Sequence, residues 1–167
     1  CYAEIGERKG LINTNGEFVT ELDKSIICVF QFNNGVASFI TETGKKGIIN
    51  KSGEIVLPAI YKNVWEDGDG GCVIDTLGNQ GYVNIKGDVI VPCRYDAVSW
   101  LNEGLLIVVT NNKCRYADST GVWVIDSIYD DARLFGDGLA RVKTNDKWRF
   151  IDKSGKVVGK LTYDDIL

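Results

Sequence analysis

Two tryptophans and a run of carboxylates are the residues of this sequence with the clearest capacity for chemistry. Trp65 precedes the segment 66–71, where alternating carboxylates and glycines could wrap a hard cation such as Ca²⁺. The segment lacks the later bidentate Glu of an EF-hand loop, and equivalent segments elsewhere are plain glycine turns, so we interpret it as a solvated turn. Exposed aromatic residues beside loops are typical anchors of an interface. The sequence therefore predicts an interaction surface formed by Trp65, Glu66, Asp67, Asp69 and Trp100.

The composition argues against most other site chemistry. The 167 residues include no His, which removes the imidazole as general base, as partner of a Ser or Cys nucleophile and as metal ligand. Adjacent carboxylates such as Asp130 and Asp131 point to opposite faces of a strand, so they are not the facing pair of a glycosidase. The five Cys form no CxxC pair. We predict no catalytic residue, no metal and no cofactor.

The charge and hydropathy patterns bear on partners and location. With 19 Lys and Arg against 23 Asp and Glu, the net charge is −4, which argues against nucleic acid and against an anionic membrane surface. No apolar run reaches the roughly 18 residues of a spanning helix, so we predict no membrane insertion. The sequence contains no Met, which suggests a processed form or a fragment. A lipid anchor on Cys1, as in a mature bacterial lipoprotein, is a minor alternative.

The sequence repeats with a period of 34 residues. Two glycine series and one tyrosine series share this spacing: Gly16, Gly53, Gly87, Gly121 and Gly155; Gly35, Gly70, Gly104 and Gly138; and Tyr61, Tyr95, Tyr129 and Tyr163. Three series with one period indicate an internal repeat. The repeat units are approximately 9–40, 46–74, 80–108, 113–142 and 147–167, with 1–8 completing the last, and together they form a single domain over 1–167.

Each repeat predicts three or four short strands. An apolar stretch ends in Asn or Asp, and a Gly follows three residues later, as in Asn50 and Gly53. This spacing is typical of a type I turn followed by a left-handed Gly in a hairpin, and we prefer it to a ring of Asn and Asp ligands. A β-branched stretch follows, which Pro58 and Pro92 are expected to end. Trp123 shares this stretch's pattern and is predicted to lie in the core. No helical period is present, so we expect an all-β fold.

The repeat register suggests how the strands close. When the repeats are aligned so that Gly10 matches Arg149, Ala3 matches Val142, so residues 1–8 supply the last strand of a repeat. Pairing of this N-terminal strand with the C-terminal unit would remove every free strand edge. We therefore predict a small five-bladed propeller-like ring, with an open β-solenoid or hairpin array as the alternative.

These residues resemble the WG-repeat (KWG-repeat) family of bacterial β-repeat proteins. The resemblance is strongest over 135–155 and extends to the segments 95–98 and 129–132, but the Trp-Gly pair is intact in no repeat. Trp148 holds the family's Trp position and is expected to pack between units, and Arg115 and Arg149 stand where Gly is usual. The resemblance implies a repeat module of bacterial, often cell-envelope or secreted, proteins, and no enzyme activity.

We therefore expect a non-enzymatic binding or scaffold module that contacts a protein in the bacterial envelope or outside the cell. Its function should lie where the repeats differ, at 20–34 and 62–72. A carbohydrate-binding envelope module that uses Trp65 and Trp100 is the first alternative, and a glycosidase-like enzyme is the second and weaker one.

Overall fold

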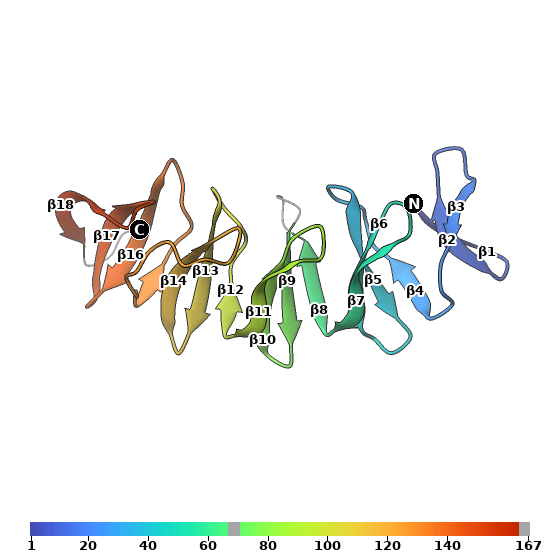
Figure 1. Cartoon of the computed structure of the whole chain (residues 1–167), viewed down its shortest axis with the longest axis horizontal. Helices are drawn as coiled ribbons and strands as arrows, with labels where there is room; N and C mark the ends of the chain where they lie inside the picture. The colour runs from blue at the N-terminus through green and yellow to red at the C-terminus, as the bar shows by residue number, and fades with distance from the viewer. Residues whose placement is uncertain (67–70, 164–167) are drawn as a thin grey trace. The chain divides into compact units, whose positions relative to one another are not determined.

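The computed structural model describes residues 1–66 and 71–163, and these residues form strands and turns without a helix. Figure 1 shows the strands following one another along the chain as small consecutive sheets. No helix in the described part of the chain is long and apolar enough to cross a membrane. The prediction of an all-β fold is therefore confirmed.

Five antiparallel sheets are formed within the described residues, each from strands that are consecutive in sequence. The first sheet has the order β1 (Tyr2–Ile5), β2 (Arg8–Ile12) and β3 (Phe18–Glu21). The second sheet has the order β4 (Ile26–Val29), β5 (Val36–Thr41), β6 (Lys46–Asn50) and β7 (Ile55–Tyr61). The third has the order β8 (Asn63–Glu66), β9 (Cys72–Thr76), β10 (Asn79–Val83) and β11 (Val89–Tyr95). The fourth has β12 (Ala97–Val98), β13 (Leu105–Thr110) and β14 (Lys113–Asp118), and the fifth has β15 (Asp131–Ala132), β16 (Leu139–Thr144), β17 (Lys147–Asp152) and β18 (Val157–Tyr163).

The chain divides into two compact units, Cys1–Gly78 with Tyr82–Val89, and Asn79–Gly81 with Ile90–Leu167. In the first unit, Leu11, Phe39 and Ile49 belong to one buried cluster. In the second unit, the Tyr116 ring makes edge-on contacts with Tyr129 and Phe135, and its hydroxyl donates to the Arg133 carbonyl over 2.6 Å. Each unit therefore has its own apolar core.

The five Asn or Asp residues that end the apolar stretches hold turns, as the sequence predicts. In each turn the Gly amide donates to the carbonyl of the Asn or Asp three residues earlier, over 2.8 to 3.2 Å. The side-chain Oδ1 of the same Asn or Asp accepts two further amides; for Asn50 these come from Ser52 at 3.0 Å and Glu54 at 2.9 Å. All five glycines have positive φ, including 90° at Gly53. In each of the five turns, backbone amides therefore occupy the Oδ1 atom of the Asn or Asp. This supports the interpretation of these residues as turn formers and not as a ring of ligands.

Four of these turns also pack against the preceding repeat. A β-carbon placed at Gly87 would overlap the carbonyl oxygen of Val56, and one placed at Gly121 would overlap that of Ile90. At Gly53 and Gly155 the close neighbours are side chains of the preceding repeat. The glycines are therefore required twice, once by the left-handed backbone and once by the close approach of a neighbouring strand.

The second glycine series forms tighter turns. Asn33 and Val36 exchange both backbone hydrogen bonds around Asn34-Gly35, at 2.8 and 3.0 Å, and both intervening residues have positive φ. The pairs Glu103-Gly104 and Asp137-Gly138 repeat this arrangement. These are two-residue hairpin turns of type I′, in which Gly occupies the second position without steric cost. Gly70 lies outside the described residues.

Two expectations about the β-branched strand that follows the Asn or Asp turn, the outer strand of its sheet, were wrong. Pro58 and Pro92 do not end it, because β7 and β11 run through them. β7 is the outer strand of its sheet, and its register shifts between the pairs Lys46↔Tyr61 and Ile48↔Leu57. A proline is tolerated at such a bulged edge because it needs no ladder donor there.

In the fourth repeat, the expected strand at 122–125 is reduced to isolated bridges, Ala117↔Trp123 and Cys114↔Tyr129. The equivalent strand in other repeats approaches a glycine closely: a β-carbon at Gly47 would lie 2.5 Å from the Leu57 carbonyl oxygen, and one at Gly81 would lie 2.5 Å from that of Val91. Arg115 takes this glycine's position in the fourth repeat. The loss of continuous pairing therefore coincides with the replacement of this glycine by Arg115.

Candidate functional site

The two tryptophans of the predicted interaction surface are both partly exposed, but they belong to different units. Trp65 lies in β8, opposite Val73 of β9, and is 42% exposed. Trp100 follows β12 and is 41% exposed; its carbonyl accepts a hydrogen bond from the Ser99 hydroxyl over 2.9 Å. The Ser99 Oγ in turn accepts the Ile107 amide over 2.8 Å, which fixes the backbone that carries Trp100.

The same predicted surface also includes the carboxylates of Glu66, Asp67 and Asp69. Glu66 is the last residue of β8, and Asp67 and Asp69 lie outside the described residues. Among the residues that the structure does describe, no group of three or more His, Cys, Asp or Glu side chains is arranged to hold a metal ion.

The other two tryptophans differ from each other in burial. Trp148 is 9% exposed, and the Arg133 guanidinium lies over its ring at 5.1 Å. Trp123 is only partly buried, so its predicted core position was wrong. Its ring meets Tyr95 edge-on, with 6.3 Å between centroids, and carries the Arg115 guanidinium at 4.6 Å. The equivalent positions of other repeats, Ile55 and Val89, are more than half exposed, because this strand turns that face outward.

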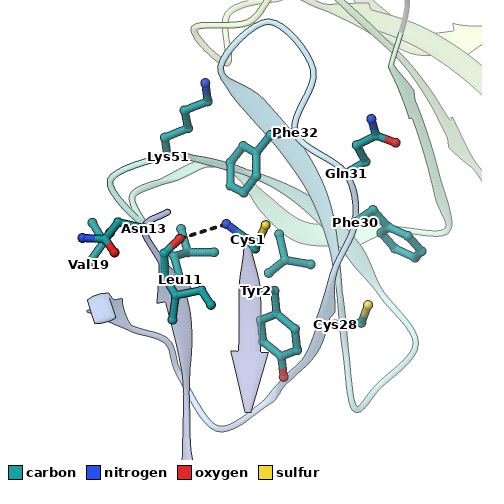
Figure 2. Close-up of a pocket in the computed structure, with 12 residues that line it drawn as sticks. Cys1, Tyr2, Leu11, Asn13, Val19, Cys28, Phe30, Gln31, Phe32 and Lys51 are labelled. Carbon is teal, nitrogen blue, oxygen red and sulfur yellow. Dashed lines mark hydrogen bonds between the residues drawn. The ribbon is translucent and has the colours of Figure 1, made fainter. Parts of the chain in front are cut away.

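A largely apolar pocket lies in the first unit. It encloses about 760 Å³ and is lined by residues of β1 to β4, the segment that follows β4, and the second Asn turn. Figure 2 shows these side chains around the space beside Cys1, with the Tyr2 ring below it and the Phe32 ring above. The lining residues include Leu11, Val19, Val29 and Phe30.

Two apolar side chains of the pocket are unusually exposed. Val19 is 52% exposed and Phe30 is 48% exposed, although both line the cavity. A cavity of this size, with apolar walls and few polar groups, has the features of a ligand-binding cleft. Exposed apolar side chains gathered at such a cleft are typical of an interaction site.

The polar groups of the pocket are few and mostly engaged. The Cys1 nitrogen donates to the Ile12 carbonyl over 2.9 Å, the bond drawn in Figure 2, and the Ile12 amide donates back over 2.7 Å. The Tyr2 hydroxyl donates to the Ile27 carbonyl over 3.4 Å, and burial, with the nearby Glu4 and Cys28, raises its pKa. Tyr2 therefore stays a neutral phenol at neutral pH. Lys51 supplies a cation at the pocket wall.

The cysteines whose side chains the structure describes are spread over both units. Cys1 is exposed, Cys28 and Cys93 are partly buried, and Cys114 is buried. Burial, with the nearby Asp131, raises the pKa of the Cys114 thiol, which keeps it protonated and unreactive.

The sequence located this pocket only in part. The segment 20–34, singled out because it departs from the repeat, contributes Cys28, Val29, Phe30, Gln31 and Phe32 to the wall. The residues of β1 and β2 were missed, because they follow the repeat pattern and carry no sign of a cavity. The aromatic residues Phe30 and Phe32, two positions apart on an irregular insertion, are the signal that could have found it.

Comparisons with known proteins agree with the repeat architecture. A family model described as a WG-containing repeat matches residues 47–71, 81–114, 115–148 and 148–167, which is more than half of the chain. A search of curated proteins finds no match.

Several solved structures are similar in fold. A crystal structure of a eukaryotic initiation factor has a TM-score of 0.53 at 12% identity, covering 97% of this chain and 51% of that one. The WD40 β-propeller domain of Doa1 gives 0.42 at 12% identity, covering 87% and 56%. BamB from Moraxella catarrhalis gives 0.44 at 14% identity, covering 94% and 59%. The chain thus spans a little over half the length of these structures.

Proposed function

The chain belongs to the WG-repeat family, and we propose that it is a non-enzymatic binding module that contacts another protein. The apolar pocket in the first unit is the observation that supports this proposal most directly. Its wall exposes Phe30 and Val19 by about half of their surfaces, 48% and 52%. Burying such side chains against a partner removes apolar surface from water, which favours association.

The proposed partner is a protein segment that presents an apolar side chain to the pocket. The cavity of about 760 Å³ is large enough for one or two aromatic or aliphatic side chains. Lys51 at the wall would favour a segment that also carries an acidic residue. We place this activity in the bacterial envelope or outside the cell, which rests on the resemblance to the family.

Peptide selection followed by titration tests this proposal. Linear peptides selected from a random display library against the purified protein should be apolar at one or two positions. In calorimetric titrations, Phe30→Ser and Val19→Ser should each weaken the selected peptide at least tenfold, because hot-spot side chains in an apolar pocket carry most of the affinity. Ile60→Ser is the matched control, since Ile60 is 61% exposed in the same unit and does not line the pocket. Unchanged affinity in both pocket variants would contradict the proposal.

The absence of catalysis is a separate part of the proposal. A peptide recovered after prolonged incubation should have an unchanged mass. A peptide that is cleaved or modified in a way that scales with protein concentration would refute a purely binding role.

A carbohydrate-binding module is the second candidate, favoured by the partial exposure of Trp65 and Trp100. A sugar ring stacks on an exposed indole, and each of these side chains is about two-fifths exposed, at 42% and 41%. Binding on a glycan array that disappears in Trp65→Ala or Trp100→Ala would support this reading. Signals that persist in both variants would leave the protein-binding proposal ahead.

A further inference from the structure

A second, smaller pocket in the other unit contains a charged residue that departs from the repeat pattern. It encloses about 330 Å³ between the segment 127–129 of the fourth repeat and the fifth sheet. Arg149 lines it, together with Ser127 and Thr144 and with the apolar side chains of Ile128, Val142 and Val157. The pocket thus combines one cation and two hydroxyls with an apolar wall.

Arg149 occupies a position that is glycine in the first three repeats. Gly10, Gly47 and Gly81 hold this place there, and β-carbons at Gly47 and Gly81 would each lie 2.5 Å from a carbonyl oxygen of the outer strand, β7 or β11. In the fifth repeat the outer strand, β18, bulges away at this position. In β7, the bulge between the strand partners of Lys46 and Ile48 contains three residues, 58–60. In β18, the bulge between the strand partners of Trp148 and Phe150 contains four, 159–162. The wider bulge gives the longer side chain of Arg149 its room.

The strand pairing fixes the direction of Arg149. Arg149 is directly opposite Val142, and Ile151 is opposite Ala140. Alternate residues of a strand share a face, so Arg149 and Ile151 share theirs. Val142 and Ile151 belong to the buried cluster that also contains Tyr129. Arg149 therefore faces the fourth repeat across the pocket.

Two acidic residues that neighbour the lining segments, Asp130 and Asp152, are engaged by other groups. Asp130 accepts the Lys113 ammonium and the Asn145 amide. Asp152 accepts the Ser154 and Lys156 amides in its turn. Among the residues that the structure describes, no hydrogen bond or ion pair is formed by the Arg149 guanidinium. Arg115, the other arginine at this repeat position, instead stacks on Trp123.

We infer that the pocket at Arg149 binds a carboxylate that carries an apolar group, such as the C-terminal residue of a peptide. A guanidinium presents two parallel donors that match the two oxygens of a carboxylate. Ser127 and Thr144 supply hydroxyl donors beside it, and Val142, Ile151 and Val157 supply a wall for an aliphatic side chain. The apolar wall favours an aliphatic carboxylate over a phosphate, which has no apolar part to bury.

The site is tested with the whole chain and defined probes. A fluorescein-labelled Gly-Ala-Leu peptide with a free carboxyl group should bind in an anisotropy titration, and the same peptide with a C-terminal amide should bind at least tenfold more weakly. Arg149→Gln should weaken the acid peptide at least tenfold and leave the amide peptide unchanged. Arg141→Gln is the control, because Arg141 pairs with Phe150 and lies on the opposite face of the same sheet.

A second variant guards against a folding defect. Arg149→Gly restores the residue of the first three repeats and should keep the melting temperature while abolishing selective binding of the acid peptide. Competition by isovalerate as strong as that by unlabelled peptide would identify a small carboxylic acid as the ligand source, and weaker competition would identify a peptide end. Equal binding of acid and amide, retained binding in Arg149→Gln, or stronger competition by inorganic phosphate would overturn the inference. So would the failure of the acid peptide and of isovalerate to bind at millimolar concentration.

Discussion

The glycines of the Asn and Asp turns show how one residue type meets two separate demands. Gly16 and Gly87 both have positive φ, 81° and 88°, but their surroundings differ. A β-carbon at Gly16 would meet nothing within 4 Å, whereas one at Gly87 would overlap the Val56 carbonyl oxygen. The pair therefore separates the cost of the backbone conformation from the cost of the close approach.

Gly16→Ala should lower the free energy of unfolding by about 1–2 kcal/mol, the cost of a left-handed backbone at a residue with a β-carbon. Gly87→Ala should cost that amount and about 1–3 kcal/mol more, because the added methyl overlaps a neighbouring strand. Urea denaturation followed by tryptophan fluorescence measures both. Equal losses in the two variants would show that the neighbouring strand moves away freely.

Where an Asp holds one of these turns, as Asp118 does, its carboxylate makes the stability of the fold depend on pH. The Thr120 hydroxyl, and then the Thr120 and Val122 amides, donate to Asp118 and hold the pKa of its carboxyl below the ordinary value of 3.8. Because the pKa is lower in the folded state, the stabilisation is present above the unfolded pKa. It is lost as the pH falls through the folded pKa.

Asp118→Asn should therefore flatten the acid side of the stability profile. An amide oxygen accepts the same backbone donors, as it does at Asn13, Asn50 and Asn84. Between pH 5 and pH 3 the melting temperature of the variant should fall less than that of the wild type. Asp126→Asn, at an exposed carboxyl of the same repeat, is the control. Identical profiles for Asp118→Asn and the wild type would contradict the role given to this carboxylate.

At the scale of the elements, small substitutions change how strands pair. In the Tyr-Asp segments, the Asp96 and Asp130 carboxylates accept the amides of Asn111 and Asn145, which lie in the next hairpin turn. Each such segment is thereby tied to the hairpin that follows it. In the fourth repeat, where Arg115 takes the place of a glycine, the outer strand is reduced to isolated bridges at Trp123 and Tyr129.

The loss of that strand changes what Trp123 contributes. Trp123→Ala should cost about 1–2 kcal/mol, from an edge-on ring contact and a cation–π contact, and not the larger loss of a core tryptophan. Ile125→Ala, at a residue that is 2% exposed in the same segment, should cost about 2–5 kcal/mol. Both losses are measured by chemical denaturation. A larger loss for Trp123 than for Ile125 would restore the core assignment.

At the scale of the whole molecule, closure of the repeats into a ring stays a prediction from the sequence. It requires β1 to pair with the C-terminal repeat, which would satisfy its outer edge. Removal of residues 1–8 tests this. For a closed ring, amide exchange should accelerate at Val142 and Ile151 in the fifth sheet as well as at Leu11 in the first. Acceleration confined to the first unit would favour an open array.

The sequence by itself determined the repeat, the all-β fold and the turn chemistry. These follow from local rules, because a left-handed turn demands Gly and an Asn or Asp side chain satisfies the amides beside it. The sequence also indicated Trp65 and Trp100 as candidates for exposed side chains, because both interrupt the regular repeat pattern.

Only the tertiary structure decided which side chains surround a cavity and which strand positions face water. Trp123 shares its pattern with Ile55 and Val89, yet that face is turned outward. Both pockets combine residues from separate parts of the chain: Tyr2 of β1 with Phe30, which follows β4, in one, and Ser127 with Arg149 of β17 in the other. Such groupings depend on how one sheet packs on the next, and the alternation of residues within a strand carries no record of that packing.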